Sequence, residues 1–366
     1  MNPFVCNKQI DLVDFEDLKL FMFKHDNLYD IAIPKARKNQ SLAQYQEFIR
    51  QHGYPRSMVS PENVTSLSQA RFGAYLFMHH LWQHGVDFTV LDIGSHIGDF
   101  SLKMGNCIRT FGQANRVIAF DPTEAGALMD YNIELNGLGK IVKHEDLAVS
   151  EFDGLMLFDY SPGFSDSAHI VRENYPETRG VSTRLHNFWC RSLRGKAVSI
   201  GKFLTLKLHK LTPAGARISS YNLIVRGVDI LSYLEQHDRD EHLFVKIDIE
   251  GFDSVVINRL LQLLPTRLVS IIFEFAPSWS LGGFEQAGGY LRKLGGSFHL
   301  FDLFYSPNPT RFNLITPSEI GRFVDEVSQR AYGYTDVFLL DKRIAECDQL
   351  VHRLSSLVAE PDRMVL

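Results

Sequence analysis

The chain has 366 residues, 45% of them apolar, which is enough to bury the core of one large domain or of two small ones. Its 38 Lys and Arg residues against 43 Asp and Glu residues give a net charge of -5, so the molecule as a whole lacks the basic charge of a typical nucleic-acid-binding protein, although a local basic patch is compatible with this balance. No apolar stretch approaches the roughly 20 residues of a membrane span, and the first residues do not resemble a secretion signal, so we expect a cytoplasmic protein without a membrane span.

The N-terminal part of the chain, residues 1–70, combines short helical patterns with interrupting prolines and glycines. No run in it alternates convincingly between apolar and polar residues, so we expect a mostly helical N-terminal extension. Residues 68–85 then place apolar side chains at helical spacing and end at a glycine, which predicts a buried helix leading into the core. The scattered cysteines, without a C-x-x-C pair, indicate buried thiols: Cys6, Cys107, Cys190 and Cys347.

From residue 88 onward, short β-branched runs alternate with helical stretches. Strands are expected in FTVLDIG, NRVIAFDP, IVKHEDLAVS, HLFVKIDIE, LVSIIFEFA, SFHLFDLFY and YTDVFLLD. Helices are expected between them in FSLKMGNCIRTF, EAGALMDYNIELNGL, DSVVINRLLQLLP and FEQAGGYLRKLGG. This order predicts an α/β domain over residues 71–342, with a mainly parallel, doubly wound sheet covered on both faces. A C-terminal helix is expected within residues 343–366.

The loop after the first strand is the first candidate binding site, because ligands of open α/β sheets bind at the carboxyl ends of the strands. This loop reads Asp92-Ile93-Gly94-Ser95-His96-Ile97-Gly98. Gly94 permits a sharp turn, and Gly98 permits a close approach of the backbone to a ligand or helix. Asp92 is expected to orient the loop or to accept a hydrogen bond from a ligand ammonium group.

The ends of the next two strands extend this site. Asp121, followed by Pro122, is placed to accept hydrogen bonds from the two hydroxyls of a ribose. After the third strand, Asp146 can accept from the exocyclic amine of an adenine, and Leu147 can lie against its ring. Asp146 serves equally well as a turn cap. Together these residues predict a site for the tail, sugar and base of a nucleoside ligand.

Two nucleoside ligands fit such a site, NAD and S-adenosylmethionine. The dinucleotide fingerprint G-x-G-x-x-G requires a middle glycine against the pyrophosphate, whereas this chain has His96 there. NAD is therefore the weaker candidate. An Asp-x-Gly turn after a strand is common in α/β proteins, so the loop alone does not define a function.

A second motif combines charged and apolar residues in Val245-Lys246-Ile247-Asp248-Ile249-Glu250-Gly251, and Glu274 ends a later strand. The acids lie where a strand breaks toward the ligand edge of the sheet. A purely structural interpretation pairs Lys246 with a carboxylate and makes Asp253 the N-cap of the next helix.

Residues 88–276 contain these segments in order: VLDIGSHIGDFS, VIAFDP, NIELNGL, DLAVSEFDG, VRGVDILSYL, FVKIDIEGFDSVVINRLL and IIFEF. In these segments and their order, the chain resembles the FkbM family of methyltransferases. The resemblance implies a Rossmann-like class I methyltransferase fold, with an antiparallel strand near the C-terminal edge of the sheet. It implies S-adenosylmethionine as methyl donor and a hydroxyl acceptor on a sugar, glycan or secondary metabolite. In the family's pattern His96 stands for a frequent Asn, and Asp121 and Asp253 each stand for a usual Glu.

The resemblance matches the family's first glycine loop to Asp92, Gly94 and Gly98, its acid after the second strand to Asp121, and its second motif to Asp248, Glu250 and Gly251. The remaining candidate residues come from their places at the strand ends. We expect the donor to be bound by residues of the first three strand ends: Asp92, Gly94, Ser95, His96, Gly98, Asp121, Pro122, Asp146 and Leu147. A carboxylate of the second motif is expected to act as base or to hold a divalent cation that lowers the pKa of the acceptor hydroxyl: Asp248, Glu250 or Glu274. His96 is a further candidate base.

The residues at about 160–228 form a basic insertion that departs from the family's pattern. It is either a cap over the acceptor pocket or a solvated basic surface. The expected acceptor is a small molecule or a carbohydrate, and nucleic acid is disfavoured because no N-P-P-Y-like box follows the fourth strand. An NAD-dependent oxidoreductase and a non-catalytic nucleoside-binding module remain alternatives. The sequence does not determine the oligomeric state.

Overall fold

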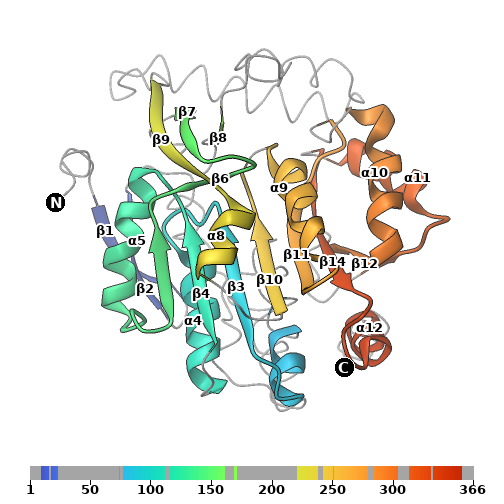
Figure 1. Ribbon diagram of the computed structural model, residues 1–366, viewed down its shortest axis with the longest axis horizontal. Coiled ribbons are helices and arrows are strands. Elements are labelled where there is room, and N and C mark those ends of the chain that lie inside the picture. The colour runs from blue at the N-terminus through green and yellow to red at the C-terminus, as the bar shows by residue number, and fades with distance from the viewer. Residues whose placement is uncertain are drawn as a thin grey trace, which may run out of the picture.

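The computed structural model describes residues 10–15, 18–23, 74, 77–111, 115–160, 169–170, 221–237, 242–249, 251–278, 283–303, 313–330 and 333–356. Its centre is an eight-stranded sheet with the strand order β13-β12-β14-β11-β10-β3-β4-β5 (Figure 1). The strands are β3 Phe88–Ile93, β4 Arg116–Phe120, β5 Val142–Glu145, β10 His242–Ile247, β11 Leu268–Phe275, β12 Phe298–Leu303, β13 Asn313–Ile315 and β14 Thr335–Asp341.

The central part of this sheet is parallel. Strands β5, β4, β3, β10 and β11 each pair in parallel with the next, whereas β14 lies antiparallel between β11 and β12. The short strand β13 adds a further antiparallel pair at the edge. The α/β class, the mainly parallel sheet and the antiparallel strand near its C-terminal edge are therefore confirmed.

Both faces of the sheet are buried, which explains why its strands are nearly continuous apolar runs. In β3, Val90 faces one core cluster, while Leu91 and Ile93 face the other. Helices α4 Asp99–Phe111, α5 Glu124–Leu135 and α12 Cys347–Ser356 contribute to the first cluster. Helices α8 Ile230–His237, α9 Asp253–Leu260, α10 Phe284–Ser297 and α11 Ile320–Gln329 contribute to the second. The sheet is thus doubly wound.

The described part of the N-terminal extension is a β-hairpin, formed by β1 Ile10–Phe15 and β2 Leu18–Phe23. These two strands had no predicted counterpart, and the expectation that residues 1–70 are mostly helical stays a prediction. Leu18, Leu20 and Met22 are buried at every second position of β2. This alternation has little meaning in the sequence alone, because the surface that buries it includes α5, more than 100 residues away (Figure 1). The other residues of the 1–70 segment lie outside the described residues.

A second, four-stranded sheet has the order β6-β9-β7-β8. Its strands are β6 Ala148–Ser150, β7 Gly154–Tyr160, β8 His169–Ile170 and β9 Tyr221–Asp229. The run IVKHEDLAVS, expected as one strand, divides into β5 and β6 at a tight turn in which the Leu147 amide donates to the Glu145 carbonyl at 2.8 Å. The described parts of the expected basic insertion belong to β8 and β9, and its residues 161–168 and 171–220 lie outside the described residues.

Other differences are local. The helix expected through DSVVINRLLQLLP is α9, followed by a 3-10 turn over Leu261–Leu263. Strands β7, β9 and β13 and helices α8 and α11 had no predicted counterpart. Residues 77–83 are helical, and the following turn contains Gly85 with φ +66°, in agreement with the predicted end of a buried helix.

Candidate functional site

Backbone hydrogen bonds join the loops that follow three neighbouring strands. The amides of Gly94 and Ser95, after β3, donate to the carbonyl of Phe120 at the end of β4, at 3.0 and 3.1 Å. On the other side, the amide of Asp248, after β10, donates to the carbonyl of Ile93 at 2.9 Å. The loop after β3, residues 94–98 and here called the donor loop, is therefore held between the ends of β4 and β10.

The donor loop requires its glycines for two different reasons. Gly94 has φ +79°, and a Cβ there would collide with the backbone carbonyl of Asp248. Gly98 has φ +87°, and a Cβ there would lie 2.6 Å from Cγ of Met129 on α5. His96 also has a positive φ, +52°, a conformation that costs a non-glycine residue about 1–2 kcal/mol. Protein contacts, rather than a ligand, already explain both glycines.

Asp121 holds the donor loop from the end of β4. Its Oδ2 accepts the amide of His96 at 2.8 Å, and its Oδ1 accepts both the amide and the hydroxyl of Thr123, at 2.9 and 2.5 Å. The side chain is buried. A carboxylate can accept about four hydrogen bonds, so one acceptor position remains for a ligand hydroxyl. The ribose role of Asp121 stays a prediction. Its structural role is to hold the amides of His96 and Thr123.

His144 on β5 contacts the backbone of Asp121, and no sequence motif indicated this contact. Its Nε2 lies 2.9 Å from the Asp121 carbonyl, and its Nδ1 lies 3.0 Å from Oδ1 of Asp130. Burial acts to lower the pKa of this imidazole, but the hydrogen bond with Asp130 and the contact with Asp121 raise it overall.

Asp92 is completely buried in β3. Its Oδ2 accepts the hydroxyl of Ser101 at 2.6 Å, and its Oδ1 lies 3.4 Å from Nζ of Lys246 on β10. Burial raises the pKa of this carboxyl, while Lys246 and Ser101 oppose the rise. Through Lys246 these contacts connect Asp92 to the carbonyl of Gly94, and the two expected roles of Asp92 stay predictions.

Lys246 connects the donor loop to the second motif. Its Nζ donates to the carbonyl of Gly94 at 3.0 Å and lies 3.2 Å from Oδ2 of Asp248. Burial acts to lower the pKa of this ammonium, but the charges of Asp248 and Asp92 raise it overall, so the side chain is charged. The predicted structural pairing of Lys246 with a carboxylate is thus present, and it reaches two carboxylates.

Three carboxylates follow one another across the ligand edge of β10, β11 and β14. Glu274 pairs in register with Asp336, and Asp248 follows the pair Ile247–Phe273, so it lies beside Glu274. We call Asp248, Glu274 and Asp336 the carboxylate row. Asp248 is partly exposed, with 37% of its side chain accessible. Glu250 lies outside the described residues.

Asp336 was missed by the sequence reading, in which YTDVFLLD was only a strand. Burial raises its pKa to about 8, and the charge of Asp248 adds to the rise. Its carboxyl is therefore protonated in part near neutral pH, because the neighbouring acids cannot all ionise together. A carboxyl with such a pKa beside a partly exposed carboxylate is typical of acid-base sites.

Asp253 adds a fourth acid but does not cap its helix. The N-cap of α9 is Phe252, without a side-chain hydrogen bond, and Asp253 is the first helical residue. Its Oδ2 accepts the amide of Gly251 at 3.1 Å, which stabilises the turn of the second motif. Burial and the charge of Asp248 raise its pKa to about 7. The expected N-cap role was wrong because the chain enters the helix one residue earlier.

The remaining predicted residues lie around the donor loop. Ser95 is buried and its hydroxyl donates to the Met129 sulfur at 3.4 Å, whereas Pro122 is half-buried beside Asp121. Asp146 is exposed on the turn after β5, and Leu147 packs partly against the core. These two residues follow the strand next to β4, as the adenine prediction requires, but the structure gives them no contact that tests this role.

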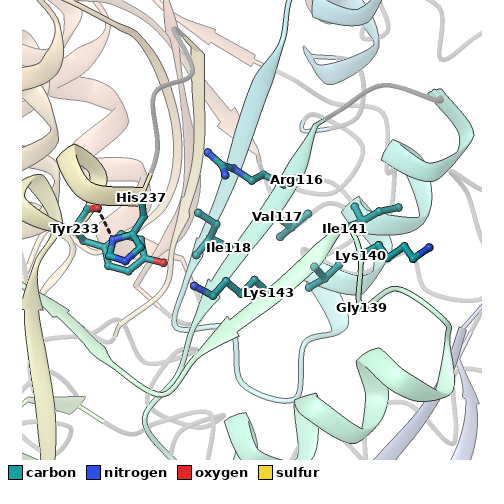
Figure 2. Close-up of a pocket in the computed structure, with 10 residues that line it drawn as sticks. Arg116, Val117, Ile118, Gly139, Lys140, Ile141, Lys143, Tyr233 and His237 are labelled. Atoms are coloured by element: carbon teal, nitrogen blue, oxygen red, sulfur yellow. Dashed lines mark hydrogen bonds between the residues drawn. The ribbon is translucent and has the colours of Figure 1, made fainter.

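A cavity of about 150 Å³ lies elsewhere, between β4, β5 and α8 (Figure 2). Figure 2 shows the stacked rings of Tyr233 and His237 on one side and Ile118 and Lys143 on the other. Ligand pockets usually enclose about 300–1,000 Å³, so this cavity is too small for a nucleoside donor. None of the predicted site residues lines it; its lining consists of Arg116, Val117, Ile118, Gly139, Lys140, Ile141, Val142, Lys143, Tyr233 and His237.

Two searches of the described residues were negative. Among them, which leave out Glu250, no three His, Cys, Asp or Glu side chains gather closely enough to hold a metal ion. None of the helices in this part of the chain is both long and apolar enough to cross a membrane.

No protein-family model and no curated protein matches the sequence. Among solved structures, the chain is similar to precorrin-6y C5,15-methyltransferase from Geobacter metallireducens, with 10% identity, a TM-score of 0.31, and coverage of 78% of this chain and 91% of that one. It is also similar to the N-terminal domain of human METTL16 in complex with SAH, with 9% identity, a TM-score of 0.35, and coverage of 86% and 84%. Because these TM-scores lie below 0.5, the similarities carry no functional argument.

Proposed function

We propose that the protein is a class I methyltransferase of the FkbM kind, which uses S-adenosylmethionine to methylate a hydroxyl group of a sugar, glycan or secondary metabolite. The observation that carries the proposal is the junction of three strand ends. There the glycine turn of the donor loop is bonded to β4 and β10 and lies next to a partly exposed carboxylate, Asp248.

The residues at this junction suit the parts of the proposed donor. Asp121 retains an acceptor position for a ribose hydroxyl, and Asp146 is exposed after the neighbouring strand. The donor loop is positioned for the amino-acid tail, with Asp92 behind it as a buried support. We assign donor binding to Asp92, Gly94, Ser95, His96, Gly98, Asp121, Pro122, Asp146 and Leu147.

The carboxylate row is the proposed acceptor side. When bound, S-adenosylmethionine supplies an electrophilic methyl group on a sulfonium. The chain's own task is to align the acceptor oxygen with that methyl group, to exclude water, and to accept the hydroxyl proton. Asp248 is the best-placed base of the described residues because it is partly exposed and is oriented by Lys246. Glu250 and Glu274 remain candidates, and so does a divalent cation held by these acids.

Calorimetric titration with S-adenosylhomocysteine tests the proposal without knowledge of the acceptor. We expect saturable binding to one site, whereas NAD should give no heat. A folded protein that binds NAD and not S-adenosylhomocysteine would support an oxidoreductase, and binding of neither ligand refutes a nucleoside site. Mass spectrometry of sugars and metabolites from cells with and without the protein then identifies the acceptor as a gain of one methyl group.

A further inference from the structure

The side chain of Asn132 on α5 links the N-terminal hairpin to the donor loop. Its Oδ1 accepts the amide of Phe21 on β2 at 2.6 Å, and its Nδ2 donates to the carbonyl of Phe21 at 3.2 Å and to the carbonyl of Ile97 at 3.0 Å. Ile97 belongs to the donor loop. Asn132 is completely buried, and its bond to the Ile97 carbonyl is buried, whereas its two bonds to Phe21 are partly buried.

The geometry of α5 matches the free edge of β2. Asn136, one turn after Asn132, accepts the amide of Lys19 at 3.0 Å and donates to its carbonyl at 2.7 Å. Residues i and i+4 of a helix lie about 5–6 Å apart on one face, close to the spacing of roughly 6.7 Å between residues i and i+2 of a strand. The two asparagines therefore bind the backbone amides and carbonyls of Lys19 and Phe21, as a neighbouring strand would.

The two asparagines differ in burial and in the partner of their second amide N–H: Asn132 is fully buried, whereas Asn136 is partly exposed and donates to the Asn132 carbonyl at 2.8 Å. Both bind the hairpin backbone, but only Asn132 uses its second amide N–H on the donor loop. An Asn side chain offers one acceptor oxygen and two donor hydrogens, and Asn132 uses all three functions in fixed directions. Displacement of β2 would free the amide of Asn132 to rotate, and the Ile97 carbonyl would lose its buried partner.

We propose that Asn132 is a positioning residue through which the N-terminal hairpin holds the donor loop in its ligand-binding conformation. This inference rests on the proposed function of the donor loop. It gives the hairpin a role in donor binding beyond covering the apolar surface of α5.

The matched variants Asn132→Ala and Asn136→Ala in the full chain test the inference. Each removes two hydrogen bonds to the β2 backbone, and only the first releases Ile97. We expect Asn132→Ala to weaken S-adenosylhomocysteine binding by about 5-fold or more, since it leaves a buried carbonyl unpaired, and Asn136→Ala to change it by less than about 2-fold. Asn132→Asp keeps the oxygen that accepts from Phe21 but loses both N–H donors, so it should weaken binding like Asn132→Ala. Equal affinities of the Asn132→Ala and Asn136→Ala variants overturn the inference.

Hydrogen exchange of the unchanged protein tests the inference even if the variants fail to fold. Coupling is reciprocal, so saturation with S-adenosylhomocysteine should slow hydrogen exchange of the Phe21 amide. An unchanged exchange rate in a protein that binds the ligand overturns the inference and leaves the proposed function intact. Absence of ligand binding in the unchanged protein refutes the proposed function first, and the positioning role with it.

Discussion

The backbone carbonyl of Asp248 lies where the Cβ of any side chain at Gly94 would have to be. The sequence predicted a sharp turn at Gly94 but not the neighbour that the turn approaches. The structure locates this obstruction within the protein, between the donor loop and the end of β10. Because the same turn has φ +79°, both sterics and backbone conformation require glycine.

We therefore predict that Gly94→Ala removes measurable binding of S-adenosylhomocysteine and also lowers thermal stability. Gly137→Ala is the matched control, because Gly137 has a similar φ of +64° but no atom within 4 Å of the added Cβ. Calorimetry and thermal unfolding of both variants provide the comparison. Equal affinity in the two variants would show that the turn at Gly94 is not part of the donor site.

Replacement of Asp121 by Ala should weaken donor binding by about 1–3 kcal/mol, the range for lost hydrogen bonds to a charged group. The change removes the proposed ribose acceptor and also the bond that holds the His96 amide. Thr123→Val is the control, since it removes the hydroxyl bond to Asp121 and the N-cap bond of α5 but keeps the Asp121 carboxylate and its bond to the His96 amide. Calorimetry that finds the same dissociation constant for wild type and Asp121→Ala would place the ribose elsewhere.

The amide substitutions Asp248→Asn and Glu274→Gln are expected to separate chemistry from donor binding. Whichever residue is the base should lose about 100-fold or more in turnover when its charge is removed, with donor affinity nearly unchanged. Steady-state kinetics on the acceptor, with calorimetry for the donor, measure both. Glu326→Gln, an exposed acid on α11, is the control. Full turnover in both site variants would make these acids structural and direct attention to Glu250 or His96.

Asp336 predicts a pH dependence of stability. Its pKa is about 8 in the folded protein, because of burial and the charge of Asp248, and about 4 in an unfolded chain. Between these values the folded state binds a proton that the unfolded state does not, so this group makes stability fall as the pH rises. Thermal unfolding from about pH 5 to about pH 8 should show a smaller decline in Asp336→Asn than in wild type. Asp325→Asn, on the exposed side of α11, should leave the decline unchanged.

The buried pair of Lys246 and Asp92 predicts non-additive stability. Lys246→Met leaves Asp92 buried without its cation and should cost about 3–5 kcal/mol of unfolding free energy. The double variant with Asp92→Asn should recover part of this loss, because no uncompensated charge remains. Urea unfolding of the two single variants and the double variant completes the cycle. Additive losses would contradict an interaction between the two side chains.

The sequence by itself determined the α/β class, the strands of the central sheet other than β13, the helices α4, α5, α9 and α10, and the strand ends at which the candidate site lies. These features follow from local patterns: apolar runs of strand length, helical periodicity, and acids or glycines directly after a strand. The boundaries of α9 and the division of β5 from β6 were less certain, since they depend on individual turns such as that at Leu147.

Only the tertiary structure decided which residues act together at this site. Asp336 joins Asp248 and Glu274 through the antiparallel pairing of β14, which brings the last strand back beside the middle of the sheet. Asn132 carries no motif, and it has meaning only because β2 packs on α5 beside the donor loop. Local patterns specify how a segment folds, whereas contacts between distant segments depend on which buried surfaces and unpaired polar groups meet in the folded chain.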